Sequence, residues 1–113
     1  LYFELQDHIE QSQKQNVFIL RLEQIYPFPY DVFSKELKRF TDCEVLWCQE
    51  EPKNMGAWLM VRDYIQWTLH YIGANNKDVS YVGRNPAAST ATGYAKKHLL
   101  QQRNIIEEVF SEL

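Results

Sequence analysis

The chain has 113 residues and a mass of 13.5 kDa, which is the size of one domain or of part of one. Apolar residues make up 45% of it and charged residues 24%, which excludes a disordered tail, a collagen-like repeat and a low-complexity linker. The net charge of −3 gives no reason to expect nucleic acid or an anionic membrane as the main partner, and no apolar run is long enough to span a bilayer.

The first predicted element is an amphipathic helix over residues 1–14. Leu1, Leu5 and Ile9 share one face at helical spacing, and a polar stretch follows from Gln11. The chain opens within this apolar pattern and without a methionine, so we expect it to be cut from a longer protein. The lack of a signal peptide therefore says little about the parent, and we expect a further strand upstream.

Three short apolar runs predict β-strands. Residues 17–22 are a nearly continuous run of β-forming residues, as expected of a strand buried on both faces of a parallel sheet. Residues 45–48 form the second predicted strand and residues 79–82 a third, weaker one. Cys43 and Cys48 are five positions apart and face opposite sides of an extended chain, so they cannot bond to each other. Two unpaired cysteines favour a reducing compartment.

Helices are predicted between these strands and after the last one. Pro29 can lie in the first turn of the second helix, where its missing N–H costs nothing. Asn54 can cap a longer third helix, and Gly73 is expected to end it. A final helix begins at about Tyr94.

This order of elements predicts the fold class. Helix and strand alternate without repeats, which is typical of an α/β fold with a mostly parallel sheet and helices on both faces. Residues 17–22 and 45–48 are expected to run side by side in the same direction. Because three strands are few for such a sheet, we interpret residues 1–113 as one domain whose first strand is missing from this fragment.

Ligands of open α/β sheets lie beyond the carboxyl ends of the strands, where three segments of this chain meet. The first, residues 23–30, is stiffened by two prolines and carries Tyr26, Phe28 and Tyr30. Large aromatic side chains on a stiff loop are typical of a protein interface. An alternative of equal weight is that Tyr26 and Phe28 fold under the loop and belong to the core.

The second segment, residues 49–58, carries the adjacent carboxylates Glu50 and Glu51. Two such groups can serve as acid and base, which would make the chain a small enzyme. Neighbours on an extended backbone point in opposite directions, however, so structural roles are favoured, with one glutamate paired to a base such as Arg21. Arg21 and Glu23 lie on the same side of their predicted strand, where pairing is again expected to be structural.

The third segment, residues 83–94, leaves a strand and reaches a helix N-terminus through small and hydroxyl-bearing residues. Backbone N–H groups, the helix dipole and a guanidinium favour an anion here, so Arg84, Ser89 and Lys97 are the candidate anion-binding residues. The alternative is a solvated loop with Thr92 as the helix cap. The sequence has no phosphate-binding glycine motif and no metal-ligand spacing among its histidines, so no metal site is predicted.

Motifs from all three segments together resemble one known family. They are RLEQIYPFP at 21–29, WCQEEPKN at 47–54, GAW at 56–58, and YVGR at 81–84 followed by AAS at 87–89 and ATG at 91–93. In this order they resemble the C-terminal domain of the decarboxylating component of 2-oxoglutarate dehydrogenase, which is transketolase-like. The resemblance covers nearly the whole chain, and the run WCQEE is its most specific part.

The resemblance implies a role for a full subunit. Such subunits decarboxylate 2-oxoglutarate on thiamine diphosphate and magnesium, and then succinylate the lipoyl group of a dihydrolipoyl succinyltransferase in the tricarboxylic acid cycle. The cofactor lies between the other two domains of a homodimer, and the C-terminal domain packs on them and supports the dimer. The fragment is thus expected to be inactive, with no catalytic residue and no bound cofactor. The compartment would be the bacterial cytoplasm or the mitochondrial matrix.

The resemblance also leaves alternatives open. Relatives that act on 2-oxoadipate share the pattern, and an independent anion-binding or nucleotide-binding module is a further hypothesis. Some relatives bind an acyl-CoA or nucleotide effector partly through this domain, for which Arg84, Ser89 and Lys97 are again the candidates. Met55 stands where family members commonly have glutamine, so any polar contact of that glutamine is lost. The strand with which the family's domain normally begins is not in this sequence.

Overall fold

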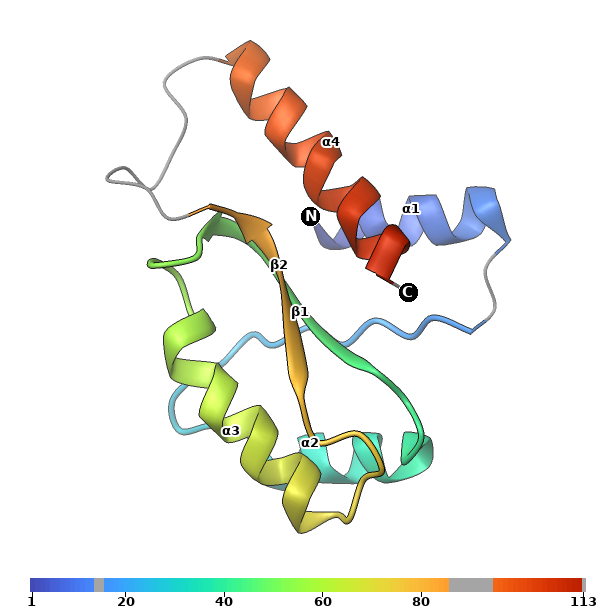
Figure 1. The fold of residues 1–113 in the computed structure, drawn as a ribbon, viewed down its shortest axis with the longest axis vertical. Helices are drawn as coiled ribbons and strands as arrows, with labels where there is room; N and C mark the ends of the chain where they lie inside the picture. Colours follow the sequence, from blue (N-terminus) through green and yellow to red (C-terminus); the bar gives the residue numbers. More distant parts are fainter. Residues whose placement is uncertain (14–15, 86–94, 113) are drawn as a thin grey trace.

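The computed structural model describes residues 1–13, 16–85 and 95–112, in which three helices come first and strands and helices then alternate. In chain order the elements are α1 (Tyr2–Ser12), α2 (Tyr30–Leu37), the 3-10 helix η1 (Lys38–Phe40), β1 (Val45–Pro52), α3 (Trp58–Tyr71), β2 (Val79–Arg84) and α4 (Ala95–Glu112) (Figure 1). The four predicted helices and the strands at 45–48 and 79–82 are confirmed.

The sheet is parallel, as predicted. β1 pairs with β2 from Val45 opposite Val79 to Cys48 opposite Val82, and the register becomes irregular before Pro52 opposite Arg84. Helix α3 joins the two strands, since a parallel pair needs a crossover connection. The helix starts at Trp58, with Ala57 at its N-cap position, so the prediction of Asn54 as the cap was wrong.

Both faces of the sheet are covered by helices, which confirms the predicted α/β arrangement. Successive residues of β1 contribute to two separate apolar clusters, because side chains alternate along a strand. Val45 and Trp47 pack into the cluster beneath α2 and α3, whereas Leu46 and Cys48 pack into the cluster of α1 and α4. Figure 1 shows α1 and α4 on one side of the strands and α2 and α3 on the other.

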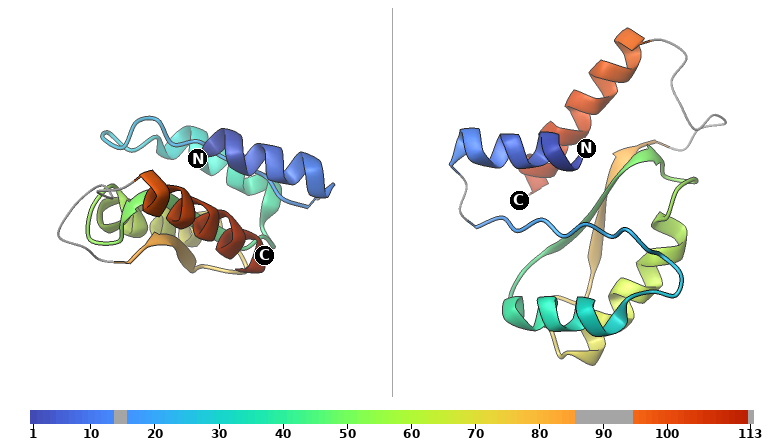
Figure 2. Two further views of the ribbon diagram at one scale, coloured as in Figure 1. Left: turned by 90° about the horizontal axis from the view of Figure 1, so that it is seen from above. Right: turned by 180° about the vertical axis from the view of Figure 1, so that it is seen from behind.

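The prediction of a strand at residues 17–22 was wrong. Among the described residues the sheet contains only β1 and β2, and no backbone hydrogen bond joins residues 17–22 to either. Phe18 is 54% exposed and Leu20 is 44% exposed, so the segment is not buried on both faces. A β-rich pattern becomes a strand only where a second backbone lies beside it. Here the segment is separated from β1 by a groove, on the edge opposite β2 (Figure 2).

The segment nevertheless keeps the side-chain alternation of a strand. Ile19 packs into the α1–α4 cluster, and Leu22 packs into the cluster beneath α2 and α3. The ring of Phe18 is tilted by 36° against that of Phe40 in η1, with ring centroids 5.3 Å apart. Residues 17–22 therefore share the two-sided packing of the sheet without sharing its hydrogen bonds.

Candidate functional site

The carboxyl end of β1 is organised around a buried amide. Gln49 is 5% exposed, and its Oε1 accepts hydrogen bonds from the indole N–H of Trp47 at 2.9 Å and from the backbone N–H of Trp58 at 3.1 Å. Its Nε2 donates to the carbonyls of the turn that follows, those of Glu51, Pro52 and Met55 at 2.9–3.1 Å. The amide thereby fixes both the turn after β1 and the start of α3.

Two glycines let the backbone close tightly around this amide. Gly56 has a φ of +65°, and a Cβ there would lie 3.0 Å from the Cβ of Glu51 and 3.2 Å from Oε1 of Gln49. At Gly83 a Cβ would collide with the Tyr81 hydroxyl and lie 2.8 Å from the carbonyl of Gln49. Side chain and backbone therefore fill the space immediately around Gln49, at the carboxyl end of β1.

The two strand ends are also tied to each other. The Tyr81 hydroxyl donates to the carbonyl of Arg84 at 3.0 Å, and the backbone N–H of Lys53 donates to the same carbonyl at 3.0 Å. Burial raises the pKa of Tyr81 above its ordinary value, against a smaller opposite effect of its contact with Gln49. These groups act as structural ties, because each is engaged within the chain.

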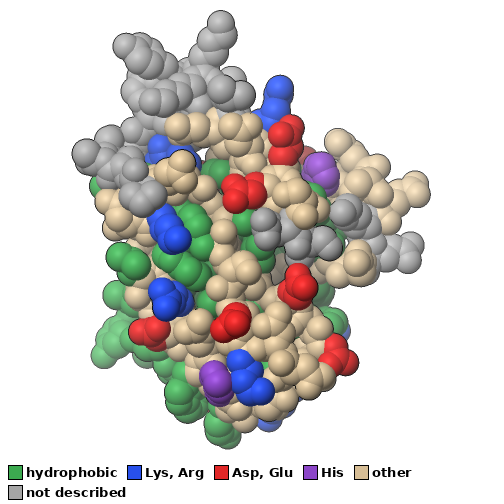
Figure 3. All heavy atoms as spheres, viewed as in Figure 1, with side chains coloured by type: hydrophobic (Ala, Val, Ile, Leu, Met, Phe, Trp, Pro, Cys, Tyr) green, Lys and Arg blue, Asp and Glu red, His purple; other side chains and the backbone are tan. Residues whose placement is uncertain are grey.

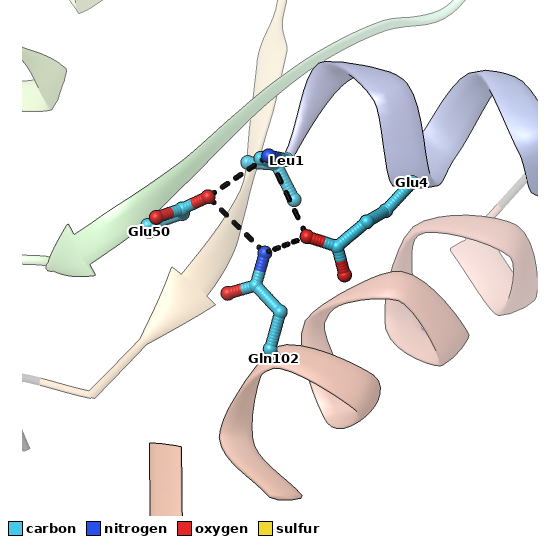
Figure 4. Close-up of polar contacts among 4 residues, drawn as sticks. All are labelled: Leu1, Glu4, Glu50 and Gln102. Atoms are coloured by element: carbon cyan, nitrogen blue, oxygen red, sulfur yellow. Dashed lines mark hydrogen bonds and ion pairs between the residues drawn. The ribbon is translucent and has the colours of Figure 1, made fainter. Parts of the chain in front are cut away.

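Glu50 and Glu51 do not form a catalytic pair. Glu50 Oε1 lies 3.0 Å from the amino group of Leu1 and accepts a hydrogen bond from Gln102 Nε2 at 3.1 Å (Figure 4). Glu51 lies instead against Gly56, at the start of α3. The two carboxylates thus belong to different faces of the sheet, as their adjacent positions on a strand require.

Arg21 is paired with Glu23 rather than with a glutamate of β1. Its Nη2 lies 3.8 Å from Glu23 Oε1, and its guanidinium lies 4.5 Å from the ring centroid of Tyr2 in α1. The prediction of an Arg21–Glu23 pair is confirmed, and the prediction that Arg21 pairs with Glu50 or Glu51 was wrong. Both side chains of the pair are at least half exposed, so its contribution to stability is small.

The candidate anion site is only partly described. Arg84 is half-buried, with Nε donating to the carbonyl of Glu50 at 2.8 Å and Nη1 to Gln101 Oε1 at 3.3 Å, so it links β1 to α4. Ser89 lies outside the described residues, and Lys97 lies within α4, one turn before Gln101. The grouping of Arg84, Ser89 and Lys97 stays a prediction.

The three predicted interface aromatics have different environments. Phe28 is 7% exposed and packs on Phe33 and Tyr64 with ring centroids 5.6 and 5.1 Å apart, so it belongs to the core. Tyr26 is 80% exposed. Tyr30 is half-buried and lies edge-on to Trp67, with ring centroids 5.1 Å apart. The core alternative therefore holds for Phe28, and the exposed position that an interface needs holds for Tyr26.

Tyr30 leads into a larger apolar surface on the outer side of α3. Trp67 and Tyr71 stack with an interplanar angle of 9°, and both are more than half exposed. Figure 3 shows hydrophobic side chains gathered over the region of α3. We call this the aromatic surface; its residues are Tyr30, Leu59, Met60, Trp67 and Tyr71.

Comparisons with known proteins place nearly the whole chain in one family. The model of the family described as 2-oxoglutarate dehydrogenase C-terminal matches residues 1–110. The 2-oxoglutarate dehydrogenase E1 components of Brucella anthropi, Brucella ovis and Brucella canis are each 45% identical to the chain over 108 residues, which is 96% of the chain. The chain belongs to the 2-oxoglutarate dehydrogenase C-terminal family. It spans 11% of the length of these relatives.

The run at residues 47–51 has a structural role for each of its parts. In this 2-oxoglutarate dehydrogenase C-terminal domain, its tryptophan and glutamine are joined by a hydrogen bond, and its last two glutamates lie on opposite faces of the sheet. The cysteine of the run, Cys48, is a free thiol whose pKa is raised to about 12, chiefly by burial. A thiol that stays protonated is a poor nucleophile, so Cys48 has a packing role.

Sequence reasoning missed Gln49 as the centre of this region. It lies on the same side of β1 as Val45 and Trp47, so strand alternation places its polar side chain toward the core. A buried amide must be hydrogen-bonded, and Trp47, which carries an indole N–H donor, lies two residues away on the same side of the strand. That combination is the signal that could have found it.

Within the described ranges, the domain offers no group of three His, Cys, Asp or Glu side chains that could hold a metal ion. None of the described helices is long and apolar enough to cross a membrane.

Proposed function

We propose that this chain is the non-catalytic C-terminal domain of a 2-oxoglutarate dehydrogenase E1 component. The full subunit would decarboxylate 2-oxoglutarate on thiamine diphosphate and magnesium, and succinylate the lipoyl group of a dihydrolipoyl succinyltransferase in the tricarboxylic acid cycle. The observation that carries the proposal is the 45% identity to E1 components over 96% of the chain. The subunit would work in the cytoplasm of a bacterium or in the mitochondrial matrix of a eukaryote.

The described residues do not fit a site for thiamine diphosphate or magnesium. They lack a set of metal-ligating side chains, and the space at the carboxyl end of β1 is filled by Gln49 and by the turn at Gly56. We therefore derive no catalytic step from these residues and assign the cofactor to parts of the subunit outside this chain.

A packing role is supported by the aromatic surface. Trp67 is 54% exposed, Tyr71 is 66% exposed, and Tyr26 at the tip of the proline-rich loop is 80% exposed. Aromatic side chains are enriched at protein interfaces and are costly to leave in water. We propose that Tyr26 and the aromatic surface pack against the other domains of the subunit or against its partner in a homodimer.

The activity is tested on the purified full-length subunit. Release of CO2 that depends on added thiamine diphosphate should be faster from 2-oxoglutarate than from 2-oxoadipate at equal concentration. A preference for 2-oxoadipate would move the chain to the alternative substrate, and no release from either substrate would contradict the proposal.

The packing role is tested with Trp67→Ala in the same subunit. Arg62→Ala is the control, because Arg62 is an exposed α3 residue outside the aromatic surface. We expect Trp67→Ala to raise the dimer dissociation constant or lower the melting temperature of the subunit, with the KM for 2-oxoglutarate unchanged. Equal dimer affinity and melting temperature in both variants would remove the aromatic surface from the interface.

Effector binding is a second candidate function of the domain. It is supported by the position of the Arg84 guanidinium at the carboxyl end of β2, beside α4. Acetyl-CoA and AMP are suitable probes, titrated calorimetrically into the full subunit. We expect Arg84→Ala to weaken binding at least about tenfold, as for loss of a charge-assisted hydrogen bond. Arg39→Ala, which removes a 61% exposed arginine side chain on η1, should not weaken it.

A further inference from the structure

The exposed side of α3 carries one line of large apolar and aromatic side chains, which we call the α3 seam. Its members follow one another at spacings of four, three and four residues, so they lie along a single line of the helix surface. They are Met60, Tyr64, Trp67 and Tyr71. All but Tyr64 are more than half exposed. Alternating steps of four and three are the pattern of a helix that packs lengthwise on another helix.

The α3 seam has the same spacing in both directions along the chain. The steps are four, three and four whether they are counted from Met60 or from Tyr71. A second α3 that runs antiparallel to the first can therefore match it along the whole seam. Met60 then faces Tyr71 of the partner subunit, and Tyr64 faces Trp67 of the partner subunit. A two-fold contact between identical chains requires such self-complementarity, because one surface serves both partners.

An acidic and a basic residue flank the α3 seam on one side. Asp63 directly precedes Tyr64, His70 directly precedes Tyr71, and both flanking residues are exposed. In an antiparallel helix pair, residues at this flanking position face each other across the contact. Asp63 then faces His70 of the partner subunit, and the two-fold axis repeats this contact. Within one copy the two residues are two turns apart, about 10.5 Å along the helix, and neither has an ion-pair partner among the described residues.

The other flank of the α3 seam is closed by the domain itself. Val61 and Thr68 directly follow Met60 and Trp67, and both are 0% exposed. The partner helix therefore meets only the flank that carries Asp63 and His70. A strongly charged partner would be matched by a flank of one sign, whereas this flank has one acid and one base. Opposite charges at matched positions instead fit a second copy of the same helix.

We propose that α3 pairs antiparallel with α3 of a second copy of the subunit. The α3 seam forms the centre of this contact, and two contacts between Asp63 and His70 form its rim. Tyr30 lies edge-on to Trp67, with ring centroids 5.1 Å apart, and extends the contact to α2. The inference rests on the proposed packing role of the aromatic surface and names what covers it, which is the partner subunit rather than another domain of the same subunit.

Partner choice between two charge variants of the full-length subunit tests this pairing. In a dimer of Asp63→Lys, two lysines face His70, and in a dimer of His70→Glu, two glutamates face Asp63. A mixed dimer has one lysine facing a glutamate and one Asp63 facing a His70, so both of its rim contacts are favourable. The two variants are coexpressed with different affinity tags and their dimers are counted by native mass spectrometry. We expect the equilibrium constant for forming mixed dimers to exceed its statistical value at least about tenfold.

Arg62→Glu supplies the matched control. Arg62 is an exposed α3 residue on the side of the helix away from the α3 seam. Coexpressed with His70→Glu, it changes the charge of the helix without creating a favourable rim contact. We expect this second pair of variants to form mixed dimers in the statistical proportion. All three substitutions are at exposed positions and introduce good helix formers, so the variants should fold.

Statistical proportions from Asp63→Lys and His70→Glu would overturn the inference, and so would a full-length subunit that sediments as a monomer. A lower melting temperature of Trp67→Ala combined with statistical mixing would also overturn it. That result would retain the packing role and show that another domain of the same subunit covers the aromatic surface. None of these measurements depends on release of CO2, so their failure is distinguishable from failure of the decarboxylase assay.

Discussion

The carboxyl end of β1 and its edge facing residues 17–22 differ in how many hydrogen bonds the chain makes to them. At the carboxyl end, Gln49 satisfies its amide with groups from β1, the turn and α3, all within ten residues of sequence. Along the edge that faces residues 17–22, the strand faces a groove of about 890 Å³. The first region is closed by hydrogen bonds within the chain and the second is open to the groove, so stability tests on the chain should separate them.

The largest expected effect comes from Gln49→Leu. The substitution leaves the Trp47 indole N–H and the Trp58 backbone N–H without their acceptor, and buried unsatisfied donors cost about 1–3 kcal/mol each. We expect a loss of about 3 kcal/mol in the free energy of unfolding, measured by urea denaturation.

Gln24→Ala is the matched control for that variant. Gln24 also donates from its amide to a backbone carbonyl, that of Pro27 at 3.2 Å, but it lies in an exposed loop. We expect a loss of less than about 1 kcal/mol here. Equal losses of stability in the two variants would show that the Gln49 amide does not organise the carboxyl end of β1.

Gly56→Ala is expected to cost less than loss of the amide. A residue at φ +65° is strained by about 1–2 kcal/mol, and the added methyl also crowds Glu51 and Gln49. Gly73→Ala isolates the strain, because φ there is +70° and a Cβ would meet nothing within 4 Å. The expected order of losses, about 2 kcal/mol for Gly56 and about 1 kcal/mol for Gly73, is read from thermal unfolding. The reverse order would contradict tight closure around Gln49.

The same contrast explains what the sequence could predict. Residues 45–48 and 79–82 become strands as predicted, because each apolar β-rich run has the other as its partner within the chain. Residues 17–22 have an equally strong pattern and no such partner among the described residues, so they are not in the sheet. A periodic pattern specifies which faces are apolar, whereas a ladder also requires a second backbone.

The carboxyl end was harder to predict for a different reason. The role of Gln49 depends on a turn that brings Met55 and Trp58 back to β1, and this turn requires the left-handed backbone of Gly56. A turn of this kind leaves no periodic pattern in the sequence. Phe28 is similar, since only its packing on Phe33 and Tyr64 distinguishes it from the exposed Tyr26.

A smaller change in stability, confined to high pH, is expected from the Cys48 thiol, which packs between β1 and helices α1 and α4. Burial raises the pKa of Cys48 to about 12, so folding favours the protonated form. The stability contributed by this thiol is complete below its unfolded pKa of about 9 and is lost as the pH rises toward 12. Above pH 9 the melting temperature should decrease with pH, and we expect this decrease to be smaller in Cys48→Ala than in the original chain. An unchanged fall would show that Cys48 is not the group that titrates.

The smallest loss of stability is expected from acetylation of the Leu1 amino group, beside the groove. The amino group of Leu1 lies 3.0 Å from Glu50 Oε1 and 3.7 Å from Glu4 Oε1, and acetylation replaces it with an uncharged amide. Because both carboxylates are about half exposed, we expect a loss of less than about 1 kcal/mol, which high salt should reduce. Gln102 still donates to both carboxylates after acetylation, so the junction of α1, β1 and α4 is retained. A loss of several kcal/mol would instead mean that the charge of the amino group organises this junction.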